Sequence, residues 1–207
     1  MYAENLFLCI IMPLIVAFPS VKSESRRFLG FLISGICVCL LSAYTNSFFM
    51  AVSGLSYDDT AVFITPVCEE ILKLLPLLFY FLVFEPSPDS LFSSAVAVGV
   101  GFATFENCCY LLSSGAGNIS FVLIRGLSAG VMHTICALAA GYGLIYISKV
   151  KQMAAIGALG ILALTVTYHA VFNLLVSVEG ITRYVGFALP LATALCWFAF
   201  IKKIKVS

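Results

Sequence analysis

Long apolar segments separated by short polar breaks run along the whole chain. Each segment holds the roughly 20 largely apolar residues that a helix needs to cross the hydrocarbon core of a bilayer. Seven segments of this kind are predicted to span a membrane: residues 4–21, 28–50, 59–84, 90–112, 119–147, 153–177 and 182–201. Residues 1–207 are therefore predicted to form a single integral-membrane domain, an all-α polytopic bundle whose chemistry-bearing core covers about residues 59–177.

The composition supports this fold class. Hydrophobic residues occupy 62% of the 207 positions and charged residues 10%, and the mean hydropathy is +1.10. These values lie outside the range of soluble globular domains. Because the formal net charge is only +1, nucleic acid is not expected as a partner, and the expected surrounding is the lipid bilayer.

The breaks predict where the third span begins and ends. Asp58 and Asp59 suit an N-cap, and Pro86 and Pro88 are expected to stop the helix. A tight turn is predicted at residues 115–118.

The distribution of cations predicts the orientation, because short cytoplasmic loops collect Lys and Arg. With seven alternating spans, Arg183 stands alone on one side. The other side holds Lys22, Arg26, Arg27, Lys149, Lys151, Lys202, Lys203 and Lys205. We therefore expect the N-terminus outside and the C-terminus in the cytoplasm.

Two adjacent glutamates lie in the middle of the third span. A carboxylate in hydrocarbon is costly unless it is paired, protonated or hydrated, so an ionisable residue at this depth indicates a functional site. The full set of such residues is Glu69, Glu70, Lys73, Glu106, Arg125, His133 and His169. They come from four successive spans of alternating direction, yet a rise of about 1.5 Å per residue places them all in the outer part of the bilayer. We expect them to form one site.

Spacing within the helices suggests different roles. Lys73 follows Glu69 by four residues and Glu70 by three, so it can neutralise either carboxylate, while the two carboxylates project about 100° apart. One carboxylate can then be held in place while the other stays available as a base. His169 and Asn173 share a helix face, so that one can carry a proton and the other can donate to an oxyanion.

These groups suit amide hydrolysis, which needs a base for water, a stabiliser for the oxyanion and an acid for the leaving amine. They also suit a divalent metal bound by Glu and His. The sequence contains no HExxH motif, which disfavours zincins, and no serine has a credible base by spacing, which disfavours α/β-hydrolases. A proton- or cation-coupled transporter is the alternative, although the chain shows no matched halves.

Four ordered motifs carry a resemblance to a known family. They are Glu69-Glu70-Ile71-Leu72-Lys73, the segment 101–110 with Glu106 and Asn107, Arg125 followed by His133 and Gly141, and His169 followed by Asn173. In this order they resemble the motifs of PrsW-type intramembrane proteases, which are distantly related to the CAAX prenyl protease and bacteriocin-processing group. In that group the first motif usually ends in Arg, one position later than Lys73 stands in this sequence, so Lys73 favours the PrsW family. A CAAX-type or bacteriocin-processing protease is the alternative.

The resemblance implies a multi-pass hydrolase in the cytoplasmic membrane of a bacterium or archaeon. It would make the first, extracytoplasmic cut in a single-pass anti-sigma factor and so begin sigma factor activation in a stress response. The implied catalytic residues, which are also the candidate metal ligands, are Glu69, Glu70, Glu106, His133 and His169. Lys73, Arg125 and Asn173 would orient carboxylates or stabilise charge. A divalent metal such as zinc is the candidate cofactor, and the choice between a metalloprotease and a glutamic protease stays open.

Overall fold

The computed structural model describes residues 2–114, 118–149 and 154–206. Within these ranges the chain is helical and contains no strand. The elements are α1 (Tyr2–Ala17), η1 (Phe18–Ser20), α2 (Ser23–Ser53), α3 (Tyr57–Phe63), α4 (Thr65–Phe84), α5 (Pro88–Ser114), α6 (Ile119–Lys149), α7 (Ala154–Ser177) and α8 (Ile181–Val206). The predicted all-α fold is confirmed.

Among the described residues, six helical stretches are long and apolar enough to cross a membrane. They are Ala3–Ser20, Ser23–Ser53, Pro88–Ser113, Ile119–Tyr146, Ile156–Ser177 and Ile181–Ala199, which match six of the seven predicted spans. The remaining predicted span, 59–84, forms α3 and α4, and the 20 residues of α4 include three charged ones, Glu69, Glu70 and Lys73. The chain is thus a polytopic helical bundle. Its orientation stays a prediction, and Lys151, one of the cations behind it, lies outside the described residues.

A break separates α3 from α4 where the sequence predicted one continuous helix. Ile64, with φ −104° and ψ −50°, ends α3, and Pro66 lies in the first turn of α4. Proline has no N–H to donate, and its ring clashes with the carbonyl four residues earlier, so it is tolerated in a first turn and interrupts a helix elsewhere. Pro66 therefore begins a new helix just before the glutamate pair.

Ser56, and neither aspartate, is the N-cap of α3. Its hydroxyl accepts from the backbone N–H of Asp59 at 3.1 Å and donates to Asp59 Oδ2 at 2.7 Å. Asp58 and Asp59 lie in the first turn instead, so the predicted aspartate cap is wrong; the serine hydroxyl satisfies one of the free N–H groups at the start of the helix. At the other end α4 stops at Phe84, two residues before Pro86, as predicted. The predicted turn at 115–118 lies mostly outside the described residues.

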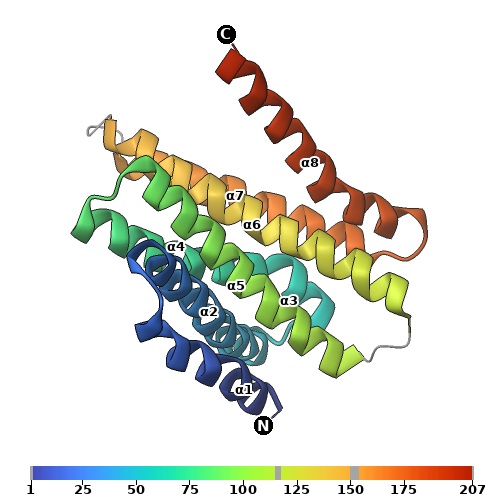
Figure 1. The fold of residues 1–207 in the computed structure, drawn as a ribbon. Coiled ribbons are helices and arrows are strands. Elements are labelled where there is room, and N and C mark those ends of the chain that lie inside the picture. The colour runs from blue at the N-terminus through green and yellow to red at the C-terminus, as the bar shows by residue number, and fades with distance from the viewer. Residues whose placement is uncertain (1, 115–117, 150–153, 207) are drawn as a thin grey trace.

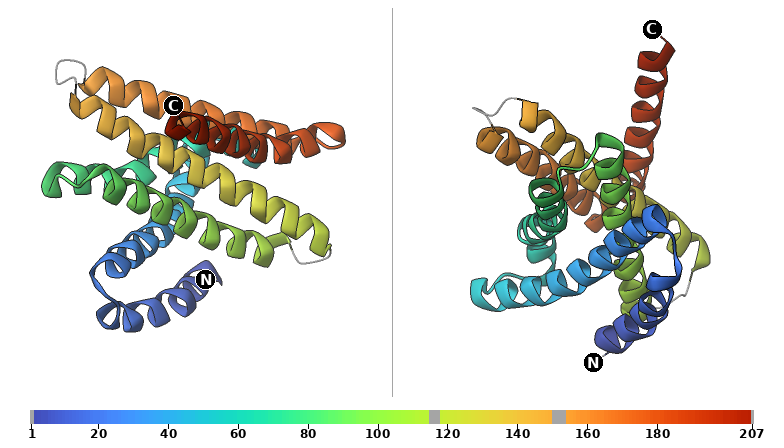
Figure 2. Two further views of the ribbon diagram at one scale, coloured as in Figure 1. Left: turned by 45° about the horizontal axis from the view of Figure 1, so that its top comes forward. Right: turned by 60° about the vertical axis from the view of Figure 1, so that its left-hand side comes forward.

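The helices form a layered bundle in which α4, α5, α6 and α7 surround the centre (Figure 1). Figure 2 shows α1 and α2 on one side of this centre and α8 on the other. Three buried apolar clusters hold it together: Ile11, Ile36, Cys39, Phe102 and Phe105; Leu77, Leu91, Ala95, Val98 and Leu144; and Ala129, Met132, Cys136, Phe172 and Phe187. Most members of these clusters lie on α2, α5, α6 and α7.

Glycines bring α5 into backbone contact with its two main neighbours, α2 and α6. A Cβ atom on Gly101 would lie 2.1 Å from Leu32 O of α2, and one on Gly99 would lie 2.7 Å from Thr134 Cα of α6. Gly35 of α2 makes the reciprocal approach, since its Cβ would lie 2.2 Å from Val98 O. Small residues permit this close packing of membrane helices. The rotation of α5, and with it the direction of Glu106, is therefore fixed from two sides.

We expect Gly101→Ala to lower the midpoint of thermal unfolding in detergent, because the added methyl group would meet the backbone of α2. Overpacking of this kind costs about 1–3 kcal/mol. Gly160→Ala on α7 is the matched control, since its Cβ would meet nothing within 4 Å. Equal midpoints for the two variants would contradict the close approach of α2 and α5.

Candidate active site

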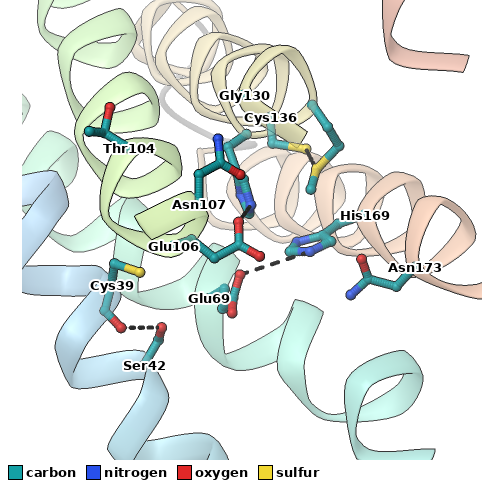
Figure 3. Close-up of polar contacts among 12 residues, drawn as sticks. Cys39, Ser42, Glu69, Thr104, Glu106, Asn107, Gly130, Cys136, His169 and Asn173 are labelled. Carbon is teal, nitrogen blue, oxygen red and sulfur yellow. Dashed lines mark hydrogen bonds and ion pairs between the residues drawn. The ribbon is translucent and has the colours of Figure 1, made fainter. Parts of the chain in front are cut away.

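The structure brings the predicted ionisable residues together between four helices. Glu69, Glu70 and Lys73 come from α4, Glu106 from α5, Arg125 and His133 from α6, and His169 from α7. All are buried except Glu106, whose side chain keeps 31% of its exposure, and Arg125, which keeps 14%. In Figure 3 the side chains of Glu69, Glu106 and His169 face one another across the centre.

Lys73 links two of these groups. Its Nζ donates to Glu70 Oε1 at 2.6 Å and lies 3.0 Å from His133 Nδ1, above the ring of Phe102. A lysine ammonium can only donate, so His133 Nδ1 accepts and the ring proton is on Nε2. His133 Nε2 lies 2.7 Å from Glu106 Oε2, to which it then donates. Lys73 thus determines which nitrogen of His133 faces Glu106 as a donor.

Glu70 also positions His169. The Nδ1 atom of His169 lies 2.8 Å from Glu70 Oε1, while its Nε2 lies 3.8 Å from Glu69 Oε2. Because the Glu70 carboxylate accepts from Nδ1, the lone pair of Nε2 points toward Glu69. The two adjacent glutamates are therefore used differently: Glu70 is engaged by Lys73 and His169, and Glu69 faces the space between the histidines.

Glu69, His133 and His169 could together hold a metal ion. Each offers one ligand atom, and these atoms all lie within 4.8 Å of one another. Two histidines and one glutamate are a donor set of catalytic zinc sites. Glu70, on the far nitrogen of His169, supplies the carboxylate that commonly orients a metal-bound histidine. The donor set fits a divalent metal, and binding it would require His133 to give up its hydrogen bond to Lys73 or to Glu106, because both of its ring nitrogens are engaged.

Arg125 restrains Glu106 from the other side. Its Nη2 donates to Glu106 Oε1 at 3.1 Å, its Nη1 donates to Asn107 Oδ1, and its guanidinium stacks on Tyr110 with 3.9 Å to the ring centroid. Asn107 Nδ2 in turn donates to Gly126 O at 3.1 Å and joins α5 to α6. One oxygen of Glu106 is thus held by Arg125, and the other remains directed at His133.

Asn173 and Asn46 lie around the cluster in different ways. Asn173 Nδ2 donates to Ala61 O at 2.8 Å and so ties α7 to α3. Asn46 of α2, which the sequence analysis did not single out, donates weakly to Glu69 Oε1 at 3.5 Å. Its buried Oδ1 has no hydrogen-bond partner among the described residues. An amide in the middle of an apolar span was the available signal, but such amides also serve as ordinary contacts between helices.

Comparison with known proteins identifies the family. No curated protein and no solved structure gave a significant match to the chain. A family model described as PrsW family intramembrane metalloprotease matches residues 24–201, a range that contains every residue of the cluster. This agrees with the resemblance carried by the four sequence motifs. The chain therefore belongs to the PrsW family of intramembrane metalloproteases and is a membrane-embedded protease.

Proposed function

We propose that the protease cuts a single-pass membrane protein at the cluster of Glu69, Glu106, His133 and His169. The observation that carries this proposal is the convergence of one carboxylate and two imidazoles within 4.8 Å, with a second carboxylate hydrogen-bonded to one of them. These groups come from four helices, and only a common function explains why four apolar helices would each bury such a residue at the same place.

The proposed metal ligands are Glu69, His133 and His169, which are the three that converge. When bound there, a divalent metal such as zinc supplies Lewis acidity at the centre of the cluster. Glu70 keeps His169 in the required orientation through Nδ1. Asn46 donates to Glu69 Oε1, and Oε2 is the oxygen that faces His169.

Glu106 is the proposed proton carrier. It is the most exposed acid of the cluster, with 31% of its side chain accessible, so water and a substrate peptide can approach it. Arg125 holds Oε1, and Oε2, which also accepts from His133 Nε2, would use its second lone pair to take a proton from the attacking water and return it to the leaving amine nitrogen. Arg125 and Lys73 balance the charge of Glu106 and Glu70 during these steps.

The substrate is proposed to be cut near the extracytoplasmic side of its span. Glu69 lies in the first turns of α4, while Glu106 and His169 lie eight residues before the ends of α5 and α7. At about 1.5 Å per residue, Glu106 and His169 are about 12 Å from the ends of α5 and α7, and Glu69 is about 6 Å from the start of α4. The cation distribution predicts that these helix ends face outside.

The proposed substrate class and location follow from the family resemblance. An anti-sigma factor with one membrane span would receive its first cut here, in the cytoplasmic membrane of a bacterium or archaeon. The family match favours this interpretation over the transporter alternative, because it describes a protease.

Glu69→Gln and Glu70→Gln should have different effects, although the residues are neighbours. Glu69→Gln should reduce cleavage of a co-expressed single-pass substrate by about 100-fold or more, with little change in thermal stability. Glu70→Gln should lower the unfolding midpoint as well, because loss of one partner from a buried ion pair costs about 3–5 kcal/mol. Glu24→Gln, in the first turn of α2 away from the cluster, is the control. The proposal fails if Glu69→Gln cleaves normally.

Metal content tests the ligand assignment independently of activity. The purified full-length protein, dialysed against zinc in detergent, should retain metal stoichiometrically when measured by plasma mass spectrometry. His169→Ala and Glu69→Gln should lose it, and Glu24→Gln should keep it. Chelation should abolish cleavage and zinc should restore it. Full cleavage by protein shown to be free of metal would instead indicate a glutamic protease.

The position of the cut tests the depth and orientation of the cluster. Sequencing of the cleavage products by mass spectrometry should place the new terminus on the extracytoplasmic side of the substrate's span. A terminus on the cytoplasmic side would overturn either the predicted orientation or the use of this cluster.

A further inference from the structure

A cavity of about 560 Å³ lies at the far end of α4 from the catalytic cluster. It opens between the start of α2 and the second half of α4, where the two helices run antiparallel. Its walls include Arg26, Arg27, Phe31, Phe79, Tyr80 and Phe84. The lining thus combines two cations with a group of aromatic rings.

The two arginines differ in their hydrogen-bond partners. Arg26 donates to Pro19 O and Val21 O, which fixes it against η1. The Nε atom of Arg27 is buried and has no hydrogen-bond partner within the described part of the chain. Neither arginine forms an ion pair with a described carboxylate. The side chain of Arg27 lines the cavity without a carboxylate partner, and an uncompensated charge close to hydrocarbon is costly, so an anionic partner from outside the chain suits Arg27.

The aromatic residues that line the cavity indicate that its partner also has an apolar part. Phe31 packs on Tyr80 with ring centroids 5.0 Å apart, and Tyr80 packs on Phe84 at 5.7 Å. Phe31 and Tyr80 line the same cavity as Arg27 and lie about one helical turn deeper, because Phe31 follows Arg27 by four residues on α2 and packs on Tyr80, whereas Phe84 is the last residue of α4. A molecule with an anionic head group and an apolar chain matches this arrangement, in which the cation lies nearer the helix end and aromatic rings lie deeper. A small free anion would leave these aromatic residues uncovered.

We propose that this cavity binds a phospholipid of the surrounding bilayer. The guanidinium of Arg27 binds the phosphate, because its planar set of donors matches phosphate oxygens. An acyl chain covers Phe31, Phe79 and Tyr80. The end of the bundle concerned is the one predicted to be cytoplasmic, where anionic lipids and clustered cations meet. This site is separate from the catalytic cluster and does not depend on the proposed protease mechanism.

Native mass spectrometry of the full-length protein tests the proposal. The detergent-purified protein is titrated with phosphatidylglycerol, with diacylglycerol of the same chains and with glycerol phosphate. Phosphatidylglycerol should bind most tightly, because only it has both the phosphate and the chains. Arg27→Gln should weaken its binding about tenfold or more, and Arg27→Lys should retain part of it.

Two further variants make the result specific. Lys22→Gln removes a neighbouring exposed charge that does not line the cavity, and should leave binding unchanged. Ser34→Phe places a ring in the cavity without altering a charge, and should weaken binding. Equal binding of phosphatidylglycerol and diacylglycerol, equally tight binding of glycerol phosphate, or unchanged binding by both Arg27→Gln and Ser34→Phe would overturn the proposal.

Discussion

The buried ammonium of Lys73 is the interaction on which the arrangement of the cluster depends. Its side chain is almost completely shielded, and it contacts a carboxylate of its own helix and an imidazole of α6. Through Glu70 it is connected to His169 on α7, and through His133 to Glu106 on α5. Loss of one partner from such a network leaves an uncompensated charge in a low-dielectric interior, at a cost of about 3–5 kcal/mol. These charges can pair only when the helices that carry them pack correctly, so charge pairing and helix packing depend on each other.

The backbone contacts of α5 make this pairing geometrically possible. Glycine lets α5 approach α2 at Gly101 and α6 at Gly99, and the second contact lies directly beside His133 O. Two turns further along α5, Glu106 meets His133 and Arg125. A side chain at either glycine would force the helices apart and lengthen these hydrogen bonds. The glycines, which have no reactive side chain, thus determine whether the ionisable side chains can meet.

The sequence predicted the helical spans and the members of the cluster, because hydropathy and residue spacing can be read directly along the chain. Hydropathy marks the spans, and helical rise places Glu106 and His169 at similar depth and His133 somewhat deeper. The break at Ile64 was not predicted, since a proline in an apolar segment can either kink a helix or begin one, and the choice depends on packing. The contact of Asn46 with Glu69 was missed for a similar reason, because it joins α2 to α4 across 23 positions.

The different surroundings of Glu69 and Glu70 could not be assigned from spacing, because Lys73 is within reach of both. In the structure the lysine pairs with Glu70, and Arg125 pairs with Glu106. Glu69 has no lysine or arginine partner among the described residues; its neighbours are the amide of Asn46 and the Nε2 atom of His169. The two cations are thus committed to two of the three carboxylates, and the third is directed at two imidazoles. A divalent cation is the partner that would balance this remaining carboxylate, which is why the ligand set proposed for the family's metal includes Glu69 and excludes Glu70.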